Sequence, residues 1–477
     1  KPGFKALVTK LAPNLKLFGR TFFTKLLHEK FNYRKQQLID ELQKSTDAST
    51  TIDAWTSRRR SYLGETIHWY DKGSLQRRNA CLAIRRVRGS HTYDVLAKLI
   101  EDIHVEFLVT SKLRASTTDS GSNFCKCFRE RGATSNFSDD DEDFSDSESD
   151  DDDMIFIDLG EILGSRSRST GSRQITLPVH RRYACHLLNL VSKVDVEKII
   201  DKSFNDLREN VEDKLDLLWN KQSSSSNNSD TIKRHLGQLF ILKNDTRWNT
   251  RFFATECVVK LIRLKEKALK KLMQELKIPY FSPSEEQFMK EYVIVMQSVV
   301  DGLNILQGDK NIGLGYLLPT LSVLKTNLRL LQDDPSIVHC QPLITSLLTS
   351  INIRFYDIFQ DKECWLAAIS NPVFKLLWLD DEDELKKARA YISSAFERNR
   401  DQLADNSKTS DEDIDETASS KADLSPDKRR RLNKNFFAKL NKKNSQNNTF
   451  DELDSYFKHC KNLEDLKNYP TVQKIYK

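Results

Sequence analysis

The sequence predicts a mixed α/β domain followed by an all-α region. Strand-like alternation of apolar and polar residues is confined to about residues 50–118, and apolar residues at helical spacing dominate about 185–400. The chain has 477 residues, 38% of them hydrophobic and 30% charged, which is long enough for two to four domains. The low apolar share also predicts stretches of exposed linker.

The α/β part begins with a helical lead-in over residues 3–44, where Leu26, Phe31 and Leu42 fall at helical spacing. From Thr50 to Val87 the pattern alternates instead, with a turn signal at 71–74. We therefore expect two or three consecutive strands that form a hairpin or a meander.

A helix is predicted over 92–107 with Thr92 as its cap, followed by a strand over 113–118 and a helix from 122. Further along, amphipathic patterns predict helices that include 258–276, 287–306 and 385–396. The polar tract 223–229 is predicted to be a loop within this helical region.

Charge is strongly segregated along the chain, although the net charge is only +6. Residues 1–137 hold 25 basic and 13 acidic residues, whereas 138–161 hold 13 acidic residues and no basic one. Such a block of like charges predicts a solvated, disordered loop, and the sharper alternative is an autoinhibitory tail that competes with nucleic acid for the basic part.

A second low-complexity tract covers 401–435 and ends in a run of four cations, Lys428, Arg429, Arg430 and Arg431. The run is typical of a nuclear localisation signal, and a solvated charge run is the alternative. Eight cysteines without dense spacing indicate reduced thiols in the cytosol or nucleus. No apolar run is long enough for a membrane span, and the chain, which opens at Lys1, reads as a fragment.

Two carboxylates occupy places where chemistry is plausible. Asp53 lies in the first predicted strand, and Asp119 lies where a strand ends and a helix begins. Acids on adjacent strands can converge on Mg²⁺, which prefers oxygen ligands and supports phosphodiester cleavage. The alternative for each is an ordinary turn or helix-cap aspartate.

Six motifs give the sequence a resemblance to the hAT superfamily of DNA transposases, and to the zinc finger BED domain-containing proteins derived from them. They occur in the order and spacing typical of that family: 3–14 (GFKALVTKLAPN), 53–57 (DAWTS), 89–93 (GSHTY), 119–124 (DSGSNF), 186–191 (HLLNLV) and 246–249 (TRWN).

The resemblance implies an RNase H-like core interrupted by a large helical insertion domain, with an Asp-Asp-Glu metal site for cutting DNA. Asp53 and Asp119 match the first two acids, as candidate catalytic residues and Mg²⁺ ligands. Trp248, after Arg247, matches a tryptophan that stacks on a flipped base; the alternative is a packing role. We also assign Arg247, Arg58, Arg59 and Arg60 to nucleic-acid binding.

The sequence also departs from the family pattern. Residues 450–477 match only the opening of its C-terminal dimerisation motif, and the third acid, a Glu, is absent, so the site is vestigial or incomplete. The adjacent Cys185 and His186 make a poor zinc chelate. No BED finger occurs, so zinc is expected only if a finger lies upstream.

These observations predict a division of the chain into seven parts. They are a helical N-terminal segment (1–45), the first part of the RNase H-like core (46–137), an acidic disordered loop (138–175), a core helix (176–200), an all-helical insertion domain (201–400), a disordered linker with the basic run (401–435) and a truncated dimerisation segment (436–477).

Three functions remain open at this point. The first is a transposase-derived, nuclear DNA-binding protein that regulates transcription or chromatin without transposase activity. The second is an active, Mg²⁺-dependent cut-and-paste transposase, and the third is a protein-interaction scaffold. Double-stranded DNA is the expected partner, with a homodimer through the C-terminal segment as a further expectation and no membrane association.

Overall fold

The structure is a computed structural model, and it describes residues 2–12, 14, 17–71, 75–89, 92–133, 175–242, 248–308, 312–406, 436–437 and 452–476. The acidic tract 138–161, Arg247 and the basic run 428–431 lie outside these residues, and so does the side chain of Trp248. The described residues fall into two compact units, which divide between residues 181 and 182.

The N-terminal unit is built on a mixed five-stranded sheet with the strand order β3-β2-β1-β4-β5. The first three strands form an antiparallel meander, and β4 pairs with β1 in parallel. The predicted meander and the predicted strand over 113–118 are thus confirmed. The strands are β1 (Ala48–Ser57), β2 (Arg60–Tyr70), β3 (Arg77–Val87), β4 (Leu113–Thr118) and β5 (Val179–Arg182).

The fifth strand was not anticipated, because a helix was expected from residue 176. β5 has four residues, Val-His-Arg-Arg, all half-buried, so it carries no apolar alternation that sequence could reveal. The expected helix begins after it as α6 (Ala184–Leu190), which continues into a π-helical turn, η2 (Val191–Asp195).

Two helices build the core of this unit against the sheet, α3 (Tyr93–Glu106) and α4 (Ser122–Arg131). Ile52, Ile67, Ile100 and Phe128 are fully buried there. Both helices match the predictions, and Thr92 occupies the N-cap position of α3. Its side chain, however, makes no capping hydrogen bond, contrary to the role expected of it.

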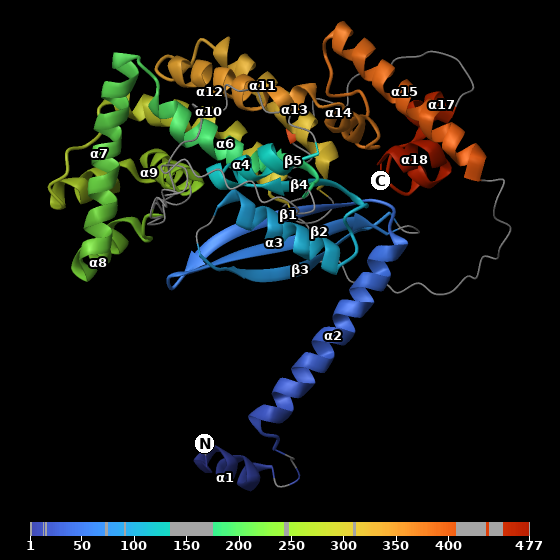
Figure 1. Ribbon diagram of the computed structural model, residues 1–477. Coiled ribbons are helices and arrows are strands. Elements are labelled where there is room, and N and C mark those ends of the chain that lie inside the picture. Colours follow the sequence, from blue (N-terminus) through green and yellow to red (C-terminus); the bar gives the residue numbers. More distant parts are fainter. Residues whose placement is uncertain are drawn as a thin grey trace, which may run out of the picture. The chain divides into compact units, whose positions relative to one another are not determined.

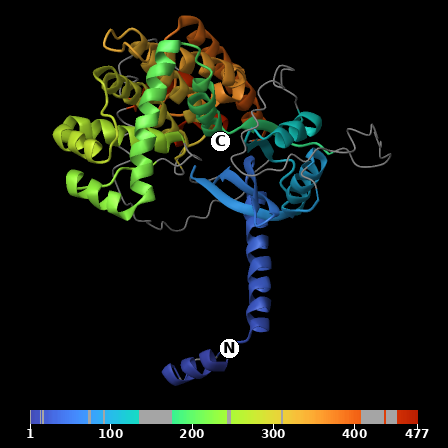
Figure 2. The same ribbon diagram turned by 90° about the vertical axis from the view of Figure 1, so that its left-hand side faces the viewer.

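The helical lead-in is confirmed as α1 (Pro2–Leu11) and α2 (Arg20–Lys44). Figures 1 and 2 both show α2 running away from the sheet as a long single helix. Leu42 is its buried residue, whereas Leu27 is 71% and Phe31 54% exposed. Helical spacing therefore predicted the helix correctly, but most of its apolar side chains face solvent.

The second unit is helical throughout its described residues and packs around one large apolar core. Its main helices are α7 (Lys202–Ser224), α8 (Ser226–Leu236), α9 (Trp248–Glu275), α10 (Pro283–Leu306), α11 (Leu317–Gln332), α12 (Gln341–Arg354), α13 (Tyr356–Gln360), α14 (Lys362–Ile369), α15 (Glu382–Asn406), α17 (Glu452–His459) and α18 (Pro470–Tyr476).

The predicted loop at 223–229 is wrong. Ser225 alone interrupts the helices, and its hydroxyl accepts a hydrogen bond from the Asn228 N–H to cap α8. Serine and asparagine satisfy the free backbone groups at a helix start, so the composition that suggested a loop instead begins a helix.

The strand order and the long helical region that follows it are consistent with an RNase H-like core joined to a helical region. Within the described residues, no helix combines the length and the apolar character that crossing a bilayer requires.

Candidate nucleic-acid interface

The register of the sheet brings the two predicted acids to matching positions. Thr51 on β1 pairs with Thr117 on β4, and Asp53 and Asp119 each follow by two residues. Because neighbouring strands lie about 4.8 Å apart, the two aspartates come to the same end of adjacent strands, with Asp119 one residue beyond the end of β4. Asp53 is exposed, on the face opposite the buried Ile52.

The surroundings of each aspartate differ. Asp119 Oδ1 accepts a hydrogen bond from the Gly121 N–H at 3.1 Å. This side chain therefore also stabilises the turn before α4, which is the role expected of an ordinary turn aspartate. Asp53 pairs in register with Gly64 on β2, and the Trp55 ring lies over that glycine.

The donor set suits a magnesium ion that keeps most of its water. Two carboxylates on adjacent strands are enough for Mg²⁺ when waters and substrate phosphate complete its coordination. Among the residues that the structure describes, no group of three or more His, Cys, Asp or Glu side chains gathers where it could hold a metal. A Mg²⁺ site formed by Asp53 and Asp119 alone stays a prediction.

The turn between β1 and β2 has an unusual composition. Ser57 pairs with Arg60, so the loop is two residues long, and both of them, Arg58 and Arg59, have positive φ angles of 49° and 61°. Two-residue hairpins with this backbone strongly favour Asn-Gly, because a Cβ is strained there. Local strain of about 1–3 kcal/mol per residue is retained chiefly at functional positions.

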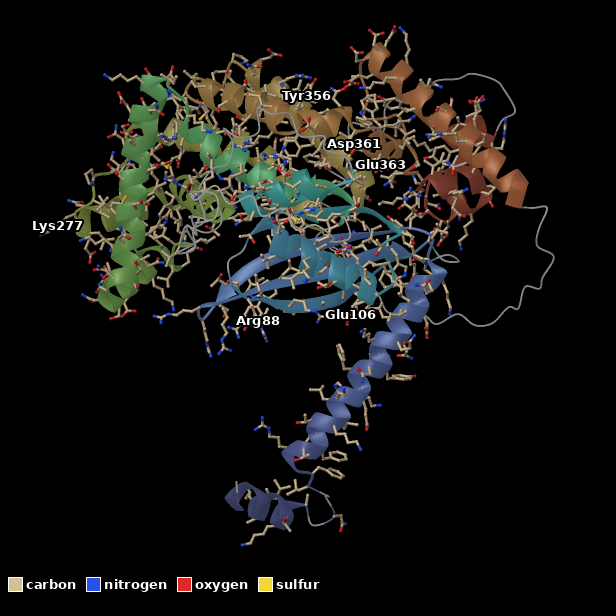
Figure 3. The ribbon with its side chains drawn as sticks, viewed as in Figure 1. Arg88, Glu106, Lys277, Tyr356, Asp361 and Glu363 are labelled. Carbon is tan, nitrogen blue, oxygen red and sulfur yellow. The ribbon has the colours of Figure 1, made fainter. Side chains whose placement is uncertain are left out.

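Five exposed arginines gather at this end of the sheet. Arg58, Arg59 and Arg60 form the turn, Arg86 pairs with Tyr62 on β2, and Arg88 follows the last pair of β3. Arg88 is labelled in Figure 3 at that end of the sheet. We call these five residues the arginine end.

Acids balance other cations of this unit but not the arginine end. Arg78 pairs with Glu41 at 3.1 Å, Arg131 pairs with Asp94 at 2.9 Å, and Arg85 pairs with Glu106. No such pair occurs for the five arginines among the described residues. Concentrated cations without acidic partners repel one another and attract a polyanion.

An aromatic pair lies beside the arginine end. Trp55 and Tyr62 are directly opposite each other on β1 and β2, with ring centroids 5.9 Å apart and planes inclined by 23°. Trp55 is 41% exposed, and Arg86 continues the same cross-strand row. Exposed aromatic faces next to cations are the recurring means of holding nucleic-acid bases and phosphates.

A polar row follows the same face towards the other end of the strands. Thr51 Oγ1 lies 3.2 Å from His68 Nε2, and an Arg77 guanidinium nitrogen lies 3.3 Å from His68 Nδ1. Burial, and secondarily the positive charge of Arg77, lower the pKa of His68 to about 4. His68 is therefore neutral at physiological pH.

The remaining predicted residues include Arg247, Trp248 and Cys185. Trp248 is the first residue of α9, and its stacking role stays a prediction, as does the role of Arg247. Burial raises the pKa of the Cys185 thiol to about 11, which disfavours the thiolate that zinc requires.

Sequence reasoning missed Trp55, Tyr62, Arg86 and Arg88. Asp53 and Trp55 are two residues apart in one strand, so alternation alone could have placed Trp55 on the face of the aspartate. Arg86 and Arg88 could not be placed in this way, because their position depends on the β2–β3 register.

Part of the chain is similar to two maize proteins. A segment of 122 residues is 31% identical to the Zea mays protein described as "Putative AC transposase". The matched segment covers 25% of this chain and 15% of that protein. A segment of 122 residues is also 31% identical to "Putative AC9 transposase" of Zea mays, and the match covers 25% of this chain and 14% of that protein. No family model matches the chain.

The chain thus spans about 15% of the length of the curated relatives it matches. The similarity is distant and partial, and it relates this chain to hAT transposases at most.

Proposed function

We propose that this chain is a DNA-binding protein related to hAT transposases, in which the transposase fold serves as a scaffold for regulating transcription or chromatin. The arginine end carries the proposal. Five exposed arginines without acidic partners, beside the Trp55–Tyr62 pair, form a surface suited to a phosphate backbone. The partial similarity to maize transposases supports the same class of ligand.

The arginines would bind the phosphates of double-stranded DNA and release condensed counterions, which supplies affinity without sequence preference. The two-residue turn fixes the backbone of Arg58 and Arg59 at the tip of the hairpin, where both side chains are exposed. The exposed face of Trp55 would contact a sugar or an unstacked base next to those phosphates.

One observation favours a second function, an active Mg²⁺-dependent transposase. The matched positions of Asp53 and Asp119 suit one Mg²⁺, which when bound would neutralise phosphate charge and activate a hydroxyl. Asp53 and Asp119 would hold the ion, and the Gly121 N–H would keep the Asp119 side chain in place. A third carboxylate among the described residues does not join them.

Binding of the full chain to labelled duplex DNA, measured by fluorescence anisotropy over a range of salt, tests the proposal. We expect affinity to fall steeply with salt, and R86Q/R88Q to lower the slope of log affinity against log salt by about two. The matched control is R78Q, because Arg78 already pairs with Glu41.

Affinity that does not change with salt, or that falls equally in R86Q/R88Q and R78Q, would favour the interaction-scaffold alternative. Cleavage of duplex ends in Mg²⁺ that is lost in D53N would favour the transposase over the regulator.

Nuclear localisation rests on the run from Lys428 to Arg431. We expect a fluorescent fusion of the full chain to enter the nucleus, and replacement of the four cations by alanine to prevent entry. A homodimer through the C-terminal residues stays a prediction, which sedimentation of the full chain would test.

A further inference from the structure

A cavity in the helical unit is lined by aromatic rings and unpartnered cations. Its volume is about 460 Å³, within the range of about 300–1,000 Å³ that is usual for ligand sites. Its lining residues come from α11, α12, α13, α14, α15 and the segment before α15, and none of them belongs to the arginine end or is one of the two aspartates. Figure 3 labels Tyr356, one of its lining residues.

The floor of the cavity is rigid. Trp365 and Trp378 are almost fully buried, with ring centroids 5.1 Å apart. The indole N–H of Trp365 donates to the Phe359 carbonyl at 2.8 Å, and that of Trp378 donates to the Lys375 carbonyl at 2.9 Å. Both rings are therefore fixed by packing and by hydrogen bonds.

The wall on α11 carries two cations one helical turn apart, Lys325 and Arg329. Neither has a hydrogen-bond acceptor or a carboxylate partner among the described residues. Lys325 Nζ lies 4.7 Å from the centre of the Phe359 ring. Burial, with a further contribution from Arg329, lowers the pKa of Lys325. Like charges at this spacing destabilise a helix, so an anion placed between them would relieve the repulsion.

The rim presents a ring for stacking. Tyr356 is 62% exposed and begins α13, three residues before Phe359. On the opposite wall, Lys387 Nζ lies 5.0 Å from the Trp365 ring centre and donates to Gln360 Oε1 at 3.4 Å. An exposed aromatic face close to unpaired cations is the combination that holds a base and its phosphate.

Three acids also line the cavity, Asp380, Asp381 and Glu384. Asp381 caps α15 by accepting hydrogen bonds from the N–H groups of Asp383 and Glu384. The Glu384 carboxylate attracts Lys325 without a close ion pair. These acids offset the positive charge of the cavity, which favours one phosphate over several, and a carboxylate accepts hydrogen bonds from the exocyclic amino group of a base.

We propose that this cavity binds one nucleotide, with its phosphate at Lys325 and Arg329, its base against Tyr356 and a base amino group facing Glu384. The shared ligand chemistry is a phosphate-bearing heteroaromatic base. Two sources can supply it, a single-stranded nucleic acid that places one nucleotide in the cavity or a free mononucleotide. This site is additional to the duplex-binding surface and does not depend on it.

The test uses the full chain and single-stranded oligo(dC) that carries one 5-iododeoxycytidine for photocrosslinking. We expect the crosslink to map by mass spectrometry to Tyr356 or Phe359. In anisotropy titrations, Y356A and K325A/R329A should weaken binding about tenfold, whereas Y356F should bind as the wild type does. The matched control is K386Q, because Lys386 precedes Lys387 on α15 but pairs with Asp383 outside the cavity.

Two further arms identify the source and the base. If deoxycytidine 5′-monophosphate competes for the cavity as well as oligo(dC) does, the natural ligand is a free nucleotide. If it competes much more weakly, the natural ligand is a single strand. Oligo(dC) should bind more tightly than oligo(dT), and E384Q should reduce that preference.

Crosslinks that map only to the N-terminal unit would overturn the proposal, and so would equal affinity of Y356A, K325A/R329A and wild type. Those results would leave duplex binding at the arginine end intact. Conversely, we expect R86Q/R88Q to keep the crosslink at Tyr356 even where this variant loses salt-dependent duplex binding. The two proposals can therefore fail separately.

Discussion

Trp55 lies directly over Gly64 on the neighbouring strand: a Cβ built at Gly64 would stand only 2.8 Å from Trp55 Cζ3. Gly64 also pairs in register with Asp53. The missing side chain at Gly64 thus leaves the space that the Trp55 indole occupies beside the arginine end. Because the atoms that would clash belong to a ring stacked on Tyr62, the space cannot be recovered cheaply.

G64A should therefore displace Trp55 and weaken duplex DNA binding. We expect a loss of stability of about 1–3 kcal/mol from overpacking and a change in tryptophan fluorescence. Anisotropy and urea unfolding measure the two effects. G302A is the control, because a Cβ there meets Thr320 Cγ2 at an ordinary 3.6 Å and alanine favours the helix. Equal behaviour of the two variants would show that Gly64 carries no packing constraint.

The double variant R58N/R59G should stabilise the protein while it weakens DNA binding. Asn-Gly fits the positive φ angles of this turn and removes strain of about 1–3 kcal/mol, but two phosphate-binding side chains are lost. Thermal unfolding should shift upward, and the salt slope of duplex binding should fall by about two. R114Q is the matched control, because Arg114 pairs with Asp47. A variant that gains stability and keeps full affinity would remove the turn from the interface.

D119N should leave the fold intact and abolish any rise of melting temperature in Mg²⁺. An asparagine Oδ1 can still accept the hydrogen bond from the Gly121 N–H, so the turn before α4 is preserved while the charge is removed. Thermal melts with and without Mg²⁺ measure the effect, with D102N on α3 as the control. An equal response to Mg²⁺ in wild type and D119N would mean that the aspartates hold no ion.

Stability should fall between pH 6.5 and pH 4 because of His68. Its folded-state pKa is lowered to about 4 while the unfolded value is 6.5, so the unfolded chain takes up the proton first as the pH falls. Well above pH 6.5 both states hold the neutral imidazole, and the residue contributes no pH dependence. Relative to pH 7, the expected loss is about 2 kcal/mol at pH 5.

Unfolding of H68Q at the two pH values should recover most of that difference, whereas H28Q, at an exposed histidine of α2, should behave as the wild type does. If H68Q and wild type lose stability equally, His68 takes up its proton in the folded protein as readily as in the unfolded chain.

Local sequence patterns predicted most of the sheet and the helical region over 185–400, and the named segments 258–276, 287–306 and 385–396 lie largely or wholly within α9, α10 and α15. Strong alternation defined the meander, and the Asp119 motif was correctly placed at a strand end. β5 was not predicted because its four residues are all half-buried and show no alternation of apolar and polar residues. The start of α8 was not predicted because its serines and asparagines have the composition of a loop.

The candidate site was less accessible to such patterns. Arg58, Arg59 and Arg60 stand out as a run, but nothing local distinguishes Arg86 from the neighbouring Arg85, which pairs with Glu106. Whether an arginine is neutralised depends on acids that are distant in sequence. The cavity in the helical unit draws its residues from five helices and from the segment before α15, so no single stretch of chain reveals it.

The long helix α2 has a practical consequence. The first half of α2, where Leu27 and Phe31 are exposed, lacks the tertiary packing from which most helical stability in proteins comes. Its amide hydrogens should exchange with deuterium early, and a protease should nick the chain there first, which separates the extended lead-in from the sheet that follows it.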